Sequence, residues 1–286
     1  MNPYYQLAFE YARLAQEGKT YPLGNFPRCP RPQVAPDAPR VLIFSPHPDD
    51  EVITGTLPLR LLRKSKWNVI NVAVTLGSKK ERQAERLAEL RAACDCVGFG
   101  LLQTAPNGLE RVRVQTRGQE PALWAQSVKI IADILAQHRP RVIFYPHELD
   151  GNPTHIGTHF LVEDALASQQ DGFNCFVVET EFWQAMDSPN RMVEASLQEL
   201  GDLMTALSFH AGEVKRNPFH LSLPAWMVDN VRRGGELIAG PGGVVPDFPF
   251  ATLYRLSRWS DGKRKPVGDG GRFLNSREDP ATLFGA

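Results

Sequence analysis

Short apolar runs alternate with longer amphipathic stretches through the middle of the chain. The apolar runs are typical of strands buried on both faces of a parallel sheet, and they cover residues 41–45, 69–75, 141–145 and 175–179. Between them, apolar residues recur every three or four positions, which predicts helices over residues 54–64, 81–97, 119–138 and 155–167. The alternation predicts an α/β fold with a Rossmann-like, mostly parallel sheet and helices on both of its faces.

The two ends of the chain have a different pattern. Asn2 as an N-cap and Pro3 as the first helical residue predict a helix to Gln16, and six prolines between residues 22 and 39 predict an extended arm. A last amphipathic helix is predicted to run from Val193 to Leu207. Glycines and prolines beyond residue 211 predict loops around a few short strands, the last over residues 251–257.

This pattern divides the chain into four parts. They are an N-terminal helix with a Pro-rich arm (1–39), a central α/β domain (40–211), an irregular, loop-rich C-terminal extension packed on the core (212–260) and a loosely ordered tail (261–286).

Composition excludes several classes of partner. Lys plus Arg equals Asp plus Glu at 32 each, so there is no general basic field to attract nucleic acid or an anionic lipid surface. No apolar stretch is long enough for a membrane span, and the first 20 residues lack the pattern of a secretory signal, which predicts a cytoplasmic protein. Four scattered cysteines predict packed, reduced thiols and no disulfide framework.

A dense polar motif follows the first apolar run directly. Residues 45–51 read Ser-Pro-His-Pro-Asp-Asp-Glu, with three acidic side chains in a row beside His47. Carboxylates this close raise one another's pKa unless a cation neutralises them. A divalent metal is such a cation, and a histidine with carboxylates suits zinc. Open parallel sheets place their sites beyond the carboxyl ends of strands, where this motif lies.

A second polar cluster follows the strand predicted over residues 141–145. It runs from His147 to His159 and contains Asp150, Asn152 and His155. The two clusters together contain four of the seven histidines. If the two strands are neighbours in the sheet, their loops face each other and a mononuclear metal site closes between them.

Each cluster also has a structural interpretation. Acidic residues in a solvated turn can cap a helix, but a second cluster at a matching strand end favours metal binding. His155 and His159 have the spacing of a helical zinc pair, yet Ile156 stands where the metalloprotease motif needs glutamate. His159 lies on the core-facing stripe of its helix and is expected to pack or to orient a neighbour. His147 is either an acid on the substrate side or a strand-end histidine bonded to backbone.

These motifs resemble those of the PIG-L/LmbE family of zinc-dependent N-acetyl-sugar deacetylases, which includes the GlcNAc-PI de-N-acetylases. The resemblance extends roughly over residues 41–211, and its most specific motif is His-Pro-Asp-Asp-Glu at residues 47–51. Three weaker segments are also similar to the family: Arg86 with Glu89-Leu90 ahead of Val97-Gly98, Asn152 to His155, and Ala206-Leu207 with His210.

The resemblance implies a set of roles. It makes His47, Asp50 and His155 the ligands of one zinc ion, with iron or another divalent metal as the open alternative, and Asp49 the general base. Asn152 is a departure, since the family often has a histidine there that stabilises the tetrahedral intermediate. Either His147 supplies that missing function or this chain handles a different substrate. The implied activity is a metal-dependent amidohydrolase that removes acetyl from an N-acetylated amino sugar or its conjugate.

Two alternatives stay open from the sequence. Asn152 leaves room for another reaction of the same superfamily, such as hydration of an unsaturated acid. A non-catalytic binding protein on a nucleotide-binding fold is the other, but the turn after the first strand is acidic and has no Gly-x-Gly-x-x-Gly motif. The expected partner is a small acetylated amino sugar, and a homo-oligomer is left open.

Overall fold

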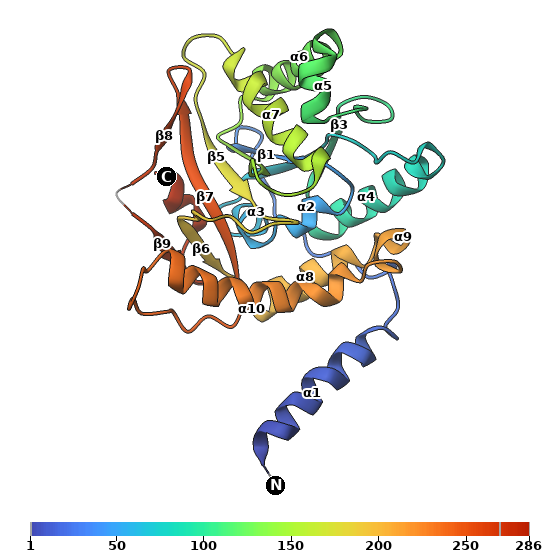
Figure 1. The fold of residues 1–286 in the computed structure, drawn as a ribbon, viewed down its shortest axis with the longest axis vertical. Coiled ribbons are helices and arrows are strands. Elements are labelled where there is room, and N and C mark those ends of the chain that lie inside the picture. The colour runs from blue at the N-terminus through green and yellow to red at the C-terminus, as the bar shows by residue number, and fades with distance from the viewer. Residues whose placement is uncertain (1, 269, 286) are drawn as a thin grey trace.

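The centre of the structure is a mostly parallel sheet (Figure 1). Within residues 2–268 and 270–285, which the computed structural model describes, nine strands form it: β1 (Arg40–Ser45), β2 (Asn68–Ala73), β3 (Gly100–Gln103), β4 (Val142–Pro146), β5 (Cys175–Thr180), β6 (Arg191–Glu194), β7 (Ala251–Ser260), β8 (Lys263–Pro266) and β9 (Arg272–Leu274). Their order is β3-β2-β1-β4-β5-β7-β6-β9, with β8 paired to β7. The first five of these are parallel, so the predicted fold class is confirmed.

Helices cover both faces of the sheet. They are α2 (Asp50–Ile53), α3 (Thr56–Arg63), α4 (Gln83–Val97), α5 (Val114–Gln119), α6 (Pro121–His138), α7 (Pro153–Ala167), α8 (Leu197–Leu207), α9 (Ala211–Val214) and α10 (Phe219–Leu237). A 3-10 turn (Lys80–Arg82) precedes α4, and another (Pro280–Phe284) ends the chain. Successive residues of β1 point to opposite faces: Val41 and Ile43 pack with α3, α4 and α8, whereas Leu42 packs with α6 and α7.

The strand order reverses between β1 and β4, which are adjacent and parallel. The neighbourhood expected for these two strands is therefore confirmed. Such a reversal leaves a crevice beyond the carboxyl ends of the two strands, because the connections on either side lead away in opposite directions. Both polar clusters of the sequence emerge at this crevice.

The secondary structure differs from the predictions in several details. The helix predicted over residues 54–64 begins at Thr56, because Gly55, with a φ of +89°, separates it from the short helix α2, which was not anticipated. Val193 belongs to β6 rather than to the following helix, which begins at Leu197. The short strand β3 and the separate helix α5 were not anticipated.

The C-terminal third is more regular than the sequence indicated. The stretch predicted as a loop-rich extension contains the 19-residue helix α10, with Gly234 and Gly235 buried inside it. A Cβ on Gly234 would lie 2.4 Å from Met192 Sδ, so this glycine permits close packing of the helix on β6. The tail is not loosely held either, because Phe284 is fully buried against Trp67 and Phe176.

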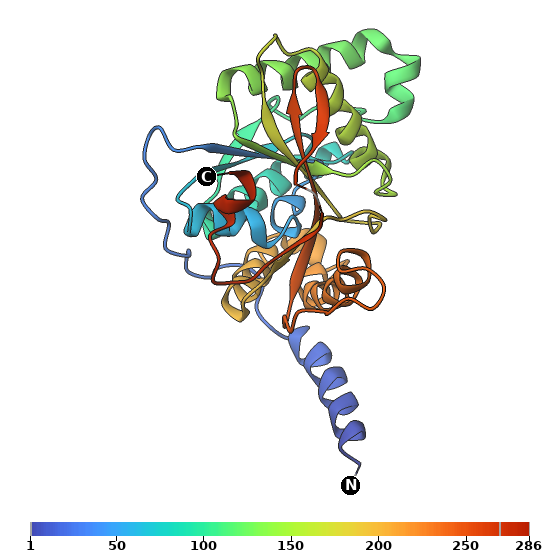
Figure 2. The same cartoon turned by 90° about the vertical axis from the view of Figure 1, so that its left-hand side faces the viewer.

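The N-terminal helix α1 (Pro3–Gly18) projects away from the rest of the chain (Figures 1 and 2). Asn2 caps it as predicted, and residues 19–39 follow as an arm without helix or strand. Gly18 is its only buried residue, packed against Leu221 of α10. Over residues 2–268 and 270–285, no helix combines the length and apolar character that crossing a bilayer requires.

Candidate metal centre and active site

The loop after β1 is folded by its own carboxylates. Asp50 Oδ2 accepts a hydrogen bond from the His47 backbone N–H at 2.8 Å. Asp49 has a φ of +114°, an unusual backbone conformation for a residue with a side chain. Its N–H donates to Glu51 Oε2 at 2.8 Å, which holds the residue in that conformation. Strained residues of this kind gather at functional sites, where the surroundings enforce them.

The loop after β4 delivers the second half of the site. Asn152 is the N-cap of α7, and its Oδ1 accepts from the Thr154 N–H at 2.9 Å. This cap starts the helix so that His155 lies in its first turn, fully buried.

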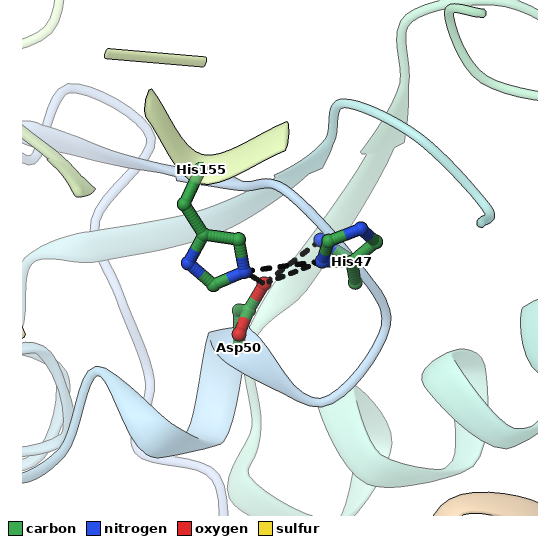
Figure 3. Close-up of side chains that lie close together, drawn as sticks. All are labelled: His47, Asp50 and His155. Carbon is green, nitrogen blue, oxygen red and sulfur yellow. Dashed lines mark hydrogen bonds and ion pairs between the residues drawn. The ribbon is translucent and has the colours of Figure 1, made fainter. Parts of the chain in front are cut away.

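The two loops bring His47, Asp50 and His155 together (Figure 3). His47 Nδ1 and His155 Nε2 lie 3.1 Å apart, and Asp50 Oδ2 lies 3.6 Å from the former and 3.3 Å from the latter. Two ring nitrogens and one carboxylate oxygen therefore face a common point. The group can hold a metal ion, since neutral imidazole and carboxylate are both metal ligands.

A buried carboxylate stands behind His155. Asp150 Oδ1 lies 2.9 Å from His155 Nδ1, but the pair lacks hydrogen-bond alignment, so the contact is chiefly electrostatic. Asp150 Oδ2 accepts from the N–H groups of Phe182 and Trp183 at 3.0 and 3.1 Å. Burial acts to lower the pKa of His155, yet the carboxylates of Asp50 and Asp150 raise it to about 10. Such a carboxylate fixes the orientation of a metal-binding histidine.

Asp49 lies beside these three side chains and is 7% exposed. Burial and the neighbouring charge of Asp50 raise the pKa of the Asp49 carboxyl well above its usual range. A carboxyl group of this kind accepts a proton more readily than an exposed one. Behind it, Glu51 Oε1 and His210 Nε2 form a fully buried contact of 2.7 Å. His210, from the motif Ala206-Leu207 with His210, is thus connected to Asp49 through Glu51.

The other histidines of the second cluster face away from the reacting groups. His147 Nε2–H donates to the Gln184 carbonyl at 2.9 Å, and its Nδ1 accepts from the Leu149 N–H at 3.3 Å. Both ring nitrogens are thus engaged with backbone, as in the structural interpretation of this residue. His159 is buried and its Nδ1–H donates to the Pro146 carbonyl at 3.0 Å, the packed position expected for it.

A second group of possible ligands, Glu148, His159 and Glu179, also lies close together. Arg255 and Arg264 already neutralise it: Arg255 Nε lies 2.6 Å and Arg264 Nη1 3.0 Å from Glu179 Oε2. Resident guanidinium groups make a metal unnecessary there. The cluster is a buried ion-pair network that joins the loop after β4 to β7 and β8.

A cavity of about 300 Å³, here called the metal cavity, lies at His47, Asp50 and His155, which are called the ligand group below. It is lined by His47, Asp49, Asp50, Ile53, Arg86, Asn152, His155, Phe182, Trp183, Glu213, Arg216, Asn217, Phe219 and Trp226. This volume is at the lower end of small-molecule sites and suits a ligand of about one sugar ring. The sequence placed Asp150 in the second polar cluster without a role, and it did not identify the aromatic residues of the cavity, for which the pair Phe182-Trp183 after a strand end was the available signal.

Comparison with known proteins finds similarity to deacetylases. Residues 42–166 match the model of the PIG-L family, described as GlcNAc-PI de-N-acetylase. A relative from Mycolicibacterium smegmatis, 1D-myo-inositol 2-acetamido-2-deoxy-alpha-D-glucopyranoside deacetylase, is 27% identical over 58% of this chain; the match spans 66% of the relative's length, less than two thirds of it.

Solved structures share the fold at low sequence identity. The N,N'-diacetylchitobiose deacetylase of Pyrococcus horikoshii is 19% identical, with a TM-score of 0.55 over 77% of this chain and 84% of that one. A conserved protein of Thermus thermophilus has a TM-score of 0.54 at 20% identity, over 75% and 93% of the two chains. The 4-carboxy-2-hydroxymuconate hydratase of Pseudomonas putida has a TM-score of 0.53 at 13% identity, over 76% and 95%.

Proposed function

We propose that this chain is a metal-dependent deacetylase of an N-acetylated amino sugar or its conjugate, on the premise that residues 42–166 match the model of the PIG-L family. The observation that carries the proposal is the convergence of His47, Asp50 and His155 on one point, with Asp49 beside them in a cavity the size of a sugar ring. The name of the mycobacterial relative supports the same class of substrate.

The ligand group fits zinc. A tetrahedral zinc ion with bonds of about 2.0–2.1 Å holds its ligand atoms about 3.3 Å apart, and the three atoms here lie 3.1, 3.3 and 3.6 Å apart. Three protein ligands are the set of a catalytic rather than a structural zinc site. When bound, zinc would polarise the amide carbonyl and lower the pKa of water to about 7. Iron or another divalent ion is the alternative that metal analysis distinguishes.

The chain's own residues would handle the protons. The Asp49 carboxylate would accept a proton from the attacking water as the new C–O bond forms at the acetyl carbonyl carbon. Asn152 Nδ2–H, at the wall of the metal cavity, would donate a hydrogen bond to the carbonyl oxygen as negative charge grows on it. Asp49 would then return the proton to the sugar nitrogen as the C–N bond breaks, which releases acetate and a free amine.

His147 is the weaker of the two candidates for the donor role. Its ring nitrogens are both engaged with backbone, and it is not among the residues that line the metal cavity. We assign it to holding the loop that carries Asp150 against the segment after β5.

The proposal is tested by acetate release from N-acetylglucosamine and its glycosides, with zinc-loaded protein and the variant Asp49→Asn. The variant should bind zinc at about one ion per chain and lose roughly 10²- to 10⁴-fold in turnover. His155→Ala should lose the metal itself. Near wild-type turnover in Asp49→Asn would contradict the assignment of the base, and absence of acetate release from every acetylated sugar would contradict the function.

A second candidate is hydration of an unsaturated acid. It is favoured by Asn152 in place of the family histidine, and a hydratase shares the fold. Loss of the conjugated absorbance of an unsaturated dicarboxylic acid, measured beside acetate release, separates the two reactions. Zinc bound without turnover of either substrate class would favour the non-catalytic alternative. The cytoplasmic location expected from the sequence stays a prediction.

A further inference from the structure

The chain exposes two of its five tryptophans, and both lie at the metal cavity. Trp183 is 60% exposed and Trp226 is 38% exposed, whereas Trp67, Trp124 and Trp259 are buried. Trp183 and Trp226 line the metal cavity and also a neighbouring cavity of about 200 Å³, here called the side cavity. Exposed aromatic side chains grouped at a cavity mark a binding surface more often than chance.

The two tryptophans are joined by a third ring. Phe219, the first residue of α10, lies 6.3 Å from Trp183 and 6.3 Å from Trp226, measured between ring centroids. We call Trp183, Phe219 and Trp226 the aromatic rim. It separates the metal cavity from the side cavity, whose floor contains the buried side chains of Leu223, Met227 and Leu253.

The rim is fixed relative to the ligand group. The N–H groups of Phe182 and Trp183 both donate to Asp150, the carboxylate that stands behind His155. Phe182 also packs edge-to-face on the His155 ring, with centroids 5.0 Å apart. Asp150 therefore contacts both His155 and the backbone of Trp183, which fixes the position of the Trp183 backbone relative to the ligand group.

The charged groups around the rim are engaged with one another. In the side cavity, Arg233 makes a bidentate pair with Glu181, with both N···O distances 2.8 Å. In the metal cavity, Arg216 pairs with Glu213, and Arg86 donates to the Pro48 carbonyl at 3.0 Å and lies 3.9 Å from Glu213. A ligand at the rim therefore meets aromatic faces and the amide side chains of the metal cavity rather than a free cation.

This chemistry suits an uncharged ring with hydroxyl groups. One face of a pyranose ring presents C–H groups, which the negative face of an aromatic ring attracts, and its hydroxyl groups bond to amides. A phosphate or carboxylate group would need a free guanidinium or ammonium group to offset its desolvation.

We propose that the aromatic rim is a second sugar subsite, which binds the pyranose ring next to the acetylated one and so makes an amino-sugar disaccharide a better substrate than the monosaccharide. The inference rests on the proposed deacetylase function. Trp183 and Trp226 are its specificity-determining residues, and they act by contact with the substrate outside the reacting group.

The test compares two probes, N,N'-diacetylchitobiose and N-acetylglucosamine, with zinc-loaded full-length protein. The measured quantity is the specificity ratio, kcat/KM for the disaccharide divided by that for the monosaccharide. Trp183→Ala and Trp226→Ala should each lower this ratio about tenfold, mainly through KM for the disaccharide, and Trp183→Tyr should restore part of it. Phe9→Ala removes an equally exposed ring from α1, 61% exposed, and should leave the ratio within about twofold of wild type.

A binding measurement separates failure of the subsite from failure of the function. In Asp49→Asn, the disaccharide should shield the exposed tryptophans from quenching by acrylamide, and the monosaccharide should shield them less. Shielding in Asp49→Asn, together with no acetate release by the zinc-loaded wild-type protein, would refute the deacetylase function and support the subsite. Acetate release with an unchanged ratio in both tryptophan variants would overturn the subsite. The subsite would also be overturned by a higher kcat/KM for an octyl glycoside of N-acetylglucosamine than for the disaccharide, if Trp226→Ala lowered both values equally. The rim would then bind an apolar chain rather than a sugar ring.

Discussion

Replacing His210 by alanine would leave Glu51 as a fully buried carboxylate without its partner. Both side chains are inaccessible to solvent, and their contact is 2.7 Å long. Burial acts to lower the pKa of His210, but the nearby Glu51 carboxylate raises it above its usual value, which favours the protonated imidazole. Removing one partner of such a pair costs about 3–5 kcal/mol, because the remaining charge stays desolvated.

This cost converts into a shift of the melting temperature. An unfolding entropy of about 2.1 cal/mol/K per residue gives roughly 0.6 kcal/mol/K for a chain of 286 residues. His210→Ala should therefore lower Tm by about 5–8 °C, measured by circular dichroism in the presence of a chelator so that metal binding does not contribute. Lys129→Ala removes one partner of an exposed ion pair with Asp133 and should lower Tm by less than about 1 °C.

A double variant distinguishes loss of a charge partner from loss of packing. Glu51→Gln removes the buried charge and can still accept a hydrogen bond from the Asp49 N–H, so Glu51→Gln/His210→Ala should be more stable than His210→Ala alone by about 2 kcal/mol. A single variant with a Tm within 1 °C of wild type, or a double variant less stable than the single one, would refute the reasoning.

Three further outcomes are expected from the same contacts. Asp150→Ala should weaken zinc affinity about 10- to 100-fold, measured by competition with a chelator, because His155 loses the carboxylate behind it. Deleting residues 2–17 should leave Tm within about 2 °C of wild type, because α1 buries only Gly18; a larger fall would show that α1 packs on the protein. Burial raises the thiol pKa of Cys96 and Cys175 to about 12, so iodoacetamide at pH 8 should label them only after unfolding, as read by mass spectrometry; labelling of the folded protein at the rate of a free thiol would contradict this.

The parallel core could be predicted because its strands are buried on both faces. β1, β4 and β5 each contain at least four apolar residues in a row, and in β2 the apolar run is interrupted only by Asn71. The structure places each strand within two residues of the predicted range. β3 has no fully buried residue, so its sequence lacks that signal. In α10, Gly234 allows close packing on Met192, whereas glycines in this stretch predicted a loop.

The ligand group could be anticipated because its residues are clustered in the sequence, at two strand ends that meet in the sheet. Residues that support the group were harder to find. Glu51 and His210 are 159 positions apart, and their contact depends on how α8 packs against α2. A single sequence contains no information on such a distance unless a motif supplies it, as the segment ending at His210 did in part.

The parts of the site that follow residue 166 have a distinct task. Tyr254 of β7 accepts from the Leu57 N–H at 3.1 Å and donates to the Thr54 carbonyl at 2.8 Å, which fixes the break between α2 and α3 below the ligand loop. Trp183 and Trp226 come from the segment after β5 and from α10. In the proposed function, the segment matched by the family model would supply the metal ligands, and the later elements would supply the aromatic walls of the metal cavity. Substitutions in residues 181–237 that keep the contacts of Asp150 with His155 and of Glu51 with His210 should therefore change substrate preference while the metal stays bound.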